Sequence, residues 1–160
     1  MAAMTNLLVK DDTVTTPVEF TLVPVTDRPD PLWRAQVANV PIEGQITLTA
    51  SWEQLKSGVH KLTAKLEVPV LETLGASGTS AGYVAPQKVA HKTTCIFTMF
   101  ASPRSTTQNR ADALKMAVGI LQGASSTTAT GVLDQASAGN AFVNSALPGP
   151  KLFIGPELPS

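Results

Sequence analysis

The segments ITLTASW (residues 46–52) and KLTAKLEV (residues 61–68) alternate apolar and polar side chains with a period of two. One side of each segment is apolar, whereas the other carries hydroxyl, lysine and glutamate groups. This pattern is typical of strands in an antiparallel sheet with one covered and one solvated face. The connection between them contains Ser57-Gly58 and predicts that the two strands form a hairpin.

The segments on either side of this hairpin also favour extended structure. Residues 18–23 alternate in the same way, and residues 32–40 resume the pattern after a proline-containing turn at 27–31. Residues 73–87 are rich in glycine and predict an exposed loop. Residues 89–101 then predict the last strand.

The period changes after residue 101, which predicts helices. Ser105 and Gln108 have the spacing of a capping box, and Gly123 is suited to a helix C-terminus. A second, weaker helix is expected at residues 129–138, followed by a proline-containing tail at 139–160. Strands followed by helices indicate an α+β fold. The first helix is apolar around much of its circumference, so we expect a second subunit to cover part of it.

The composition bounds the function. The 160 residues suggest one domain, and only 15% are charged, compared with about 25% in ordinary soluble domains. With 43% hydrophobic residues, this favours a self-assembling subunit over a monomer with a Ser/Thr-rich surface. The formal net charge is zero, so no overall basic field indicates nucleic acid. We expect neither a signal peptide nor a membrane-spanning segment.

No combination of residues predicts catalysis. His60 and His91 lie in predicted strands without metal-ligand partners, and the single cysteine, Cys95, has no second thiol. The glycine-rich loop lacks the Gly-Lys-Ser/Thr ending of a phosphate loop. We therefore expect no enzyme activity, no metal and no cofactor.

The solvated side of the predicted sheet offers a candidate RNA-binding surface. Its hydroxyls and lysines are groups that bind phosphates and base edges. No aromatic residue is predicted on this side, which argues against base stacking. A merely solvated face is the alternative reading of the same residues. The candidate residues are Thr47, Thr49, Ser51, Lys61, Thr63, Lys65, Glu67 and Lys92.

Residues 46–122 resemble the coat proteins of single-stranded RNA bacteriophages, the leviviruses. The resemblance depends on the series ITLTASW, HKLTAKLEVPV, a glycine-rich loop, TTCIFTMFAS and RADALKMAVGILQG. The residues before this span fit more loosely, as an N-terminal hairpin and the next strand.

The resemblance implies a particular fold within a single domain of residues 1–160. An N-terminal β-hairpin precedes a five-stranded antiparallel sheet, and two C-terminal helices interlock across a dimer. The hairpin and first sheet strand would occupy residues 1–45, the main sheet 46–101, the helices 105–138, and a C-terminal extension 139–160.

The resemblance also implies a structural function. Dimers would assemble in the bacterial cytoplasm into an icosahedral virion capsid around single-stranded genomic RNA, without a membrane partner. In the family, the inner sheet face binds an RNA hairpin and thereby represses replicase translation. The chain departs from the family at Ser51, where an arginine is common, and near Ala90, where some members carry a base-stacking aromatic. A non-viral RNA-binding module that uses the same Lys/Thr face is the alternative.

Overall fold

A computed structural model of the chain describes residues 4–13, 15–72 and 88–121. The chain divides into two compact units. The sheet unit comprises the residues up to Val9 together with Glu19–Pro103, and the second unit comprises Lys10–Val18 and the chain from Arg104 onward. The single domain over residues 1–160 stays a prediction.

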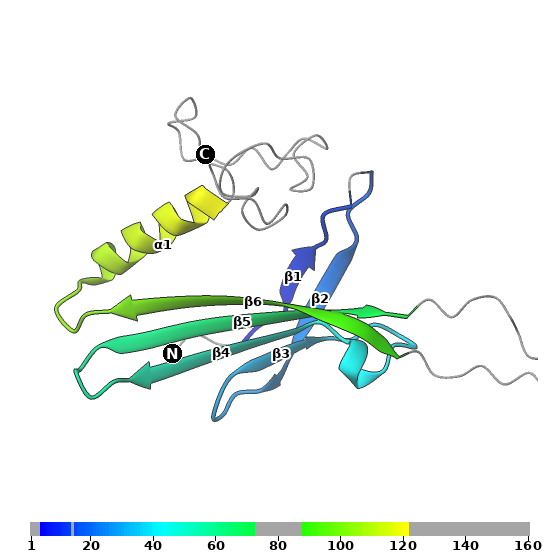
Figure 1. Ribbon diagram of the computed structural model, residues 1–160, viewed down its shortest axis with the longest axis horizontal. Coiled ribbons are helices and arrows are strands. Elements are labelled where there is room, and N and C mark those ends of the chain that lie inside the picture. The colour runs from blue at the N-terminus through cyan, green and yellow to red at the C-terminus, as the bar shows by residue number, and fades with distance from the viewer. Residues whose placement is uncertain (1–3, 14, 73–87, 122–160) are drawn as a thin grey trace, which may run out of the picture. The chain divides into compact units, whose positions relative to one another are not determined.

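The sheet has six strands, which lie side by side in the order of the sequence (Figure 1). The pairings from β2 through β6 are antiparallel. The strands are β1 (Leu7–Lys10), β2 (Glu19–Thr26), β3 (Leu32–Ala35), β4 (Thr47–Gln54), β5 (His60–Leu71) and β6 (Val89–Ala101).

The α+β class is confirmed, but the prediction of five sheet strands is wrong. The strands of the N-terminal hairpin, β1 and β2, continue the same sheet because β2 pairs with β3. Without that pairing, β3 would leave a row of main-chain donors and acceptors unsatisfied at the sheet edge. The last strand, β6, has the predicted bounds. β4 begins one residue later and ends two residues later than the predicted segment, and β5 extends beyond its predicted segment at both ends.

Strand β3 ends earlier than predicted, and Gln45 accounts for the shape of the connection that follows. The Gln45 side-chain amide donates to the carbonyl oxygens of Val37 (3.0 Å) and Val40 (2.9 Å). Its Oε1 accepts a hydrogen bond from the Val37 amide at 3.0 Å. Asn39 adopts a positive φ of 63°, which interrupts extended structure. The predicted strand at residues 32–40 is therefore limited to Leu32–Ala35.

A short 3-10 helix, η1 (Ile42–Gly44), lies close to β5 at the end of this connection. A Cβ atom on Gly44 would lie 2.6 Å from Cδ2 of Leu71 and 3.0 Å from Cγ1 of Val40. A larger residue at position 44 would therefore require the Leu71 side chain to move, whereas glycine permits the close approach.

The buried core of the described residues is small. Leu22, Ala35 and Ala101 are the buried hydrophobic residues, and Gln45 is the buried polar residue. The apolar face of the central sheet, formed by Leu48, Ala50, Leu62, Ala64 and Leu66, is only half-buried. Such a sheet needs further cover before its apolar area is removed from water.

Two aromatic side chains lie at the hairpin end of this apolar face. The rings of Trp52 and His60 stack with centroids 5.7 Å apart, and Trp52 is 63% exposed. Cys95, which pairs with Leu66 across the sheet, is a free and exposed thiol. The sequence context of Cys95 is apolar, but the sheet leaves its side chain open.

The helix α1 (Thr107–Leu121) belongs to the second unit and contains no buried residue. Its capping box forms one residue later than predicted. Thr106 Oγ1 accepts from the Asn109 amide (3.1 Å), while Asn109 Oδ1 accepts from the Thr106 amide (3.0 Å). Ser105 instead accepts hydrogen bonds from the Arg110 guanidinium.

Several predicted segments lie outside the described residues. These are the loop at 73–87, the C-terminus expected at Gly123, the second helix at 129–138 and the tail at 139–160. The described residues thus contain one α-helix where two C-terminal helices were predicted. Within this described part, no helix is long and apolar enough to cross a membrane.

Candidate nucleic-acid interface

The cross-strand register places all of the predicted RNA-binding residues on one face of the sheet. Thr47 pairs with Glu67, Thr49 with Lys65, and Ser51 with Thr63. Paired residues in antiparallel strands point to the same side, and alternate residues share that side. Lys61 precedes Thr63 by two positions, and Lys92 pairs with Pro69, two positions after Glu67. We call this surface of β3–β6 the polar face.

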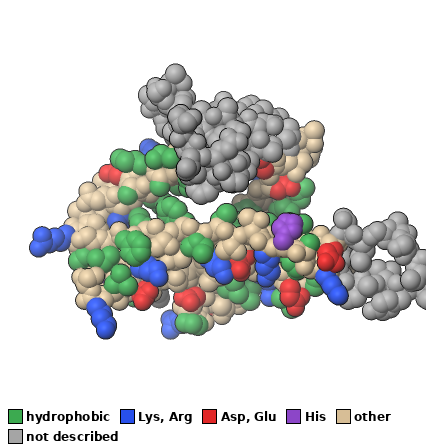
Figure 2. Space-filling model, viewed as in Figure 1, with side chains coloured by type: hydrophobic (Ala, Val, Ile, Leu, Met, Phe, Trp, Pro, Cys, Tyr) green, Lys and Arg blue, Asp and Glu red, His purple; other side chains and the backbone are tan. Residues whose placement is uncertain are grey.

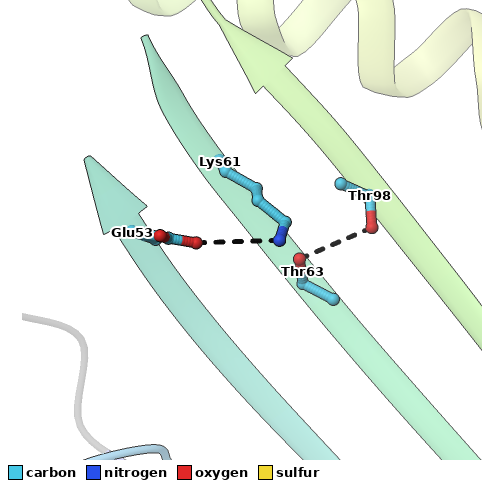
Figure 3. A network of polar contacts seen from close by, with 4 residues as sticks. All are labelled: Glu53, Lys61, Thr63 and Thr98. Carbon is cyan, nitrogen blue, oxygen red and sulfur yellow. Dashed lines mark hydrogen bonds and ion pairs between the residues drawn. The ribbon is translucent and has the colours of Figure 1, made fainter. Parts of the chain in front are cut away.

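Two ion pairs engage the lysines of β5. Lys65 Nζ lies 3.0 Å from Glu67 Oε1 on the same strand. Lys61 Nζ lies 3.6 Å from Glu53 Oε2 on β4 (Figure 3). The side chain of Lys61 is 40% exposed and that of Lys65 is 42% exposed. Solvent therefore screens both pairs, and each contributes little to stability.

Glu67 is held more firmly than Glu53. It accepts a hydrogen bond from the Thr47 hydroxyl at 3.3 Å, and its side chain is 29% exposed, compared with 62% for Glu53. The hydrogen bond from Lys65 lowers the pKa of Glu67 below its ordinary value, and the charges of Lys65 and Lys92 and the Thr47 hydroxyl act in the same direction. Glu67 is therefore an anion at neutral pH in the middle of a lysine-bearing surface.

Hydroxyl groups of Ser51, Thr63 and Thr98 form a row across the neighbouring strands β4, β5 and β6. The hydroxyls of Thr63 and Thr98 lie 3.4 Å apart, and either can donate to the other (Figure 3). Ser51 is paired with Thr63 on the other side. Since each hydroxyl both donates and accepts, the row can rearrange to suit phosphate, ribose or base-edge groups.

The register also reveals two residues of the polar face that sequence reasoning missed. Arg34 on β3 pairs with Thr47, and Phe100 on β6 pairs with Lys61. Ile96, which the alternation of the last strand predicts on this face, pairs with Lys65. Phe100 is 63% exposed, so the prediction that no aromatic residue stands on this face is wrong. The alternation of the last strand, continued by two residues past Thr98, would have identified it.

The polar face has a moderate excess of positive charge. On β3–β6 its basic side chains are Arg34, Lys61, Lys65 and Lys92, and its carboxylates are Glu53 and Glu67. Figure 2 shows basic, acidic and hydrophobic side chains interspersed over the visible surface rather than separated into large patches. This arrangement suits a diffuse contact with polyanions better than one deep anion site.

Among residues 4–13, 15–72 and 88–121, no group of three or more His, Cys, Asp or Glu side chains could hold a metal ion. The described polar face offers ionic contact, hydrogen bonding and the exposed ring of Phe100.

The comparisons with known proteins point to one family. A family model described as levivirus coat protein matches residues 2–143. The coat protein of bacteriophage EMS014 is 46% identical, with a TM-score of 0.84, over 99% of this chain and 100% of that one. A comparison with curated protein sequences gave no match.

Two assembled particles are also similar. A virus-like particle of bacteriophage EMS014 matches with 47% identity and a TM-score of 0.86, over 99% of this chain and 100% of that one. A virus-like particle of bacteriophage ESE058 matches over the same shares with a TM-score of 0.71. Its identity is 17%, so this likeness concerns the fold alone.

Proposed function

We propose that this chain, which belongs to the levivirus coat protein family, encloses single-stranded RNA in an icosahedral shell and contacts it through the polar face. Membership of the family makes the chain a capsid structural protein whose place is the virion capsid. The family is structural rather than enzymatic. Assembly in the bacterial cytoplasm is part of the proposal.

The observation that carries the RNA contact is the register of β4, β5 and β6. It collects the predicted hydroxyls and lysines on a single face, although they come from three strands. Lysines that neutralise phosphates release counterions and provide affinity without sequence preference. Hydroxyls beside them can bond to phosphate, ribose 2′-OH or base edges.

The ion pairs on the polar face support a contact of moderate strength. A phosphate that binds Lys61 or Lys65 must compete with Glu53 or Glu67 for the ammonium group. Each replacement exchanges one screened ion pair for another, so the net gain per contact is small. A shell repeats such contacts in many subunits, and weak contacts add up when they are linked. Recognition of one specific RNA hairpin, and repression of replicase translation through it, would need side chains that make base-specific contacts in addition to these charges.

Dimerisation, with helices interlocking between two copies, is supported by uncovered apolar surface. In α1, Met116 is 66% exposed, Ile120 60% and Leu114 44%. The apolar face of the sheet is half-buried, and β6 is the last strand of the described sheet. A second copy that pairs along β6 and lays its helices on this face would satisfy the strand edge and bury apolar area.

Expression of the full-length chain, followed by size-exclusion chromatography, electron microscopy and RNA extraction, tests the proposal. We expect closed particles that contain RNA. Particles without RNA would contradict the RNA contact alone, whereas a stable monomer that binds RNA without forming particles would favour the non-viral RNA-binding module instead.

A further inference from the structure

We infer that Phe100 is a stacking platform for an RNA base, which rests on the proposed function. Phe100 pairs directly with Lys61 on the polar face and is 63% exposed. An aromatic ring exposed on a hydroxyl-rich, basic surface needs an explanation, because burial of such a ring is strongly favourable.

The neighbours of Phe100 provide the other parts of a nucleotide site. Lys61 lies beside it on β5, about 5 Å away at the Cβ atoms as in any directly paired position. Thr98 precedes it by two positions on the same face and shares a hydroxyl contact with Thr63. A nucleotide whose base stacks on the Phe100 ring could therefore place its phosphate near Lys61. Its ribose or base edge could reach the hydroxyls of Thr98 and Thr63.

The ion pair beside Phe100 holds a cation that a phosphate can reach. Lys61 leans toward Glu53, at 3.6 Å, and this long, exposed pair can open when a phosphate arrives (Figure 3). Sheets that carry exposed aromatic rings among basic residues stack single-stranded bases in the same way. Every base has a π-face, so the contact would be tolerant of sequence, as packaging of a whole genome requires.

Ile96 gives a matched control on the same strand. It pairs with Lys65, as Phe100 pairs with Lys61, and it is 62% exposed. It therefore offers apolar area in a similar electrostatic setting but no aromatic ring.

The test uses full-length protein freed of cellular RNA and two fluorescent probes, an oligouridine and an abasic ribose-phosphate oligomer of the same length. We expect Phe100→Leu to weaken oligouridine binding on the order of tenfold, with little change for the abasic probe. Phe100→Tyr, which keeps a ring, and Ile96→Ala should retain the wild-type preference for the oligouridine. Ultraviolet crosslinking of wild-type particles, analysed by mass spectrometry, should attach uridine to Phe100.

Equal losses for both probes, or unchanged oligouridine binding in Phe100→Leu, would overturn the role of Phe100. So would crosslinks confined to other residues, or a variant that loses particles but keeps its preference for bases. If the wild-type protein binds neither probe, the RNA contact of the proposed function fails first, and the two failures are thereby distinguished.

Discussion

Replacement of Glu67 by Gln should strengthen the binding of single-stranded RNA. Glu67 holds Lys65 at 3.0 Å and accepts a hydrogen bond from Thr47 at 3.3 Å. Glutamine has nearly the same shape and can keep the contact with Thr47, but it carries no charge. Lys65 then becomes available to phosphate, and a repulsive carboxylate disappears from the polar face.

The size of the effect follows from two contributions. A phosphate on the open side of the Lys65 ammonium would lie roughly 6 Å from the Glu67 carboxylate, which corresponds to about 0.7 kcal/mol of repulsion in a water-like dielectric. Release of the exposed ion pair adds about 0.5 kcal/mol. Together these predict an increase of roughly fivefold to tenfold in affinity per occupied site, at low salt.

Fluorescence anisotropy with a labelled oligouridine, measured over a series of salt concentrations, checks this prediction. The slope of log affinity against log salt should become steeper by about 0.7 if one more phosphate is neutralised. Glu53→Gln is the matched control. Its carboxylate is 62% exposed and 3.6 Å from Lys61, so we expect a smaller increase. Weaker binding in Glu67→Gln, or an unchanged salt slope, would refute the assignment of Lys65 to phosphate.

The lowered pKa of Glu67 fixes the pH dependence of the same contacts. Because the folded pKa lies below the ordinary value of 4.5, the stabilisation is fully present above pH 4.5 and is lost as the pH falls through the folded pKa. The stability difference between wild type and Glu67→Gln should therefore disappear in acid, as measured by denaturant unfolding. A difference that persists unchanged at low pH would show that the charge of Glu67 is not its cause.

Three further predictions concern charge, the β3–β4 connection and the N-terminal hairpin. Replacing Lys61 and Lys65 together by Ala should make the salt slope shallower by about 1.4 and reduce packaged RNA in intact particles; unchanged RNA content would contradict the polar-face assignment. Gln45→Ala removes three hydrogen bonds of a buried side chain, and should cost about 2–4 kcal/mol in chemical denaturation, whereas a loss below about 0.5 kcal/mol would contradict the role given to Gln45. Asp11→Ala should speed hydrogen exchange at the Val18 amide, which donates to Asp11 at 2.7 Å. Since this bond lowers the pKa of Asp11 below 3.8, wild-type protection should persist until the pH falls through that lower value; equal exchange rates in the two proteins at neutral pH would be inconsistent with it.

Alternation of side chains predicted the central sheet well because it is a local signal with a strict period. Thr47, Lys65 and Lys92 could be assigned to one face before their strands were known to be neighbours. Phe100 belongs to the same face because the alternation of β6 continues to the end of the strand, where Phe100 pairs with Lys61.

Other features could not be predicted because they depend on contacts that the alternation of side chains does not encode. The early end of β3 depends on the Gln45 side chain, which folds back onto main-chain groups five to eight residues away. The sixth strand depends on the pairing of β2 with β3, and neither segment specifies it alone. The helix cap lies at Thr106 rather than at Ser105. Both adjacent hydroxyl residues could serve, but Thr106 accepts from the Asn109 amide whereas Ser105 accepts from the Arg110 guanidinium.

The long edge strand β6, thirteen residues from Val89 to Ala101, has a consequence for inheritance. Strand pairing uses main-chain groups and tolerates changes in many side chains. If copies pair along β6, a subunit with a substitution on its polar face can still pair with a wild-type subunit. In a cell that carries mixed genomes, such an allele would enter shells made mostly of intact subunits and weaken their hold on RNA. Because many weak contacts add up, the defect would grow in proportion to the share of damaged subunits in the shell.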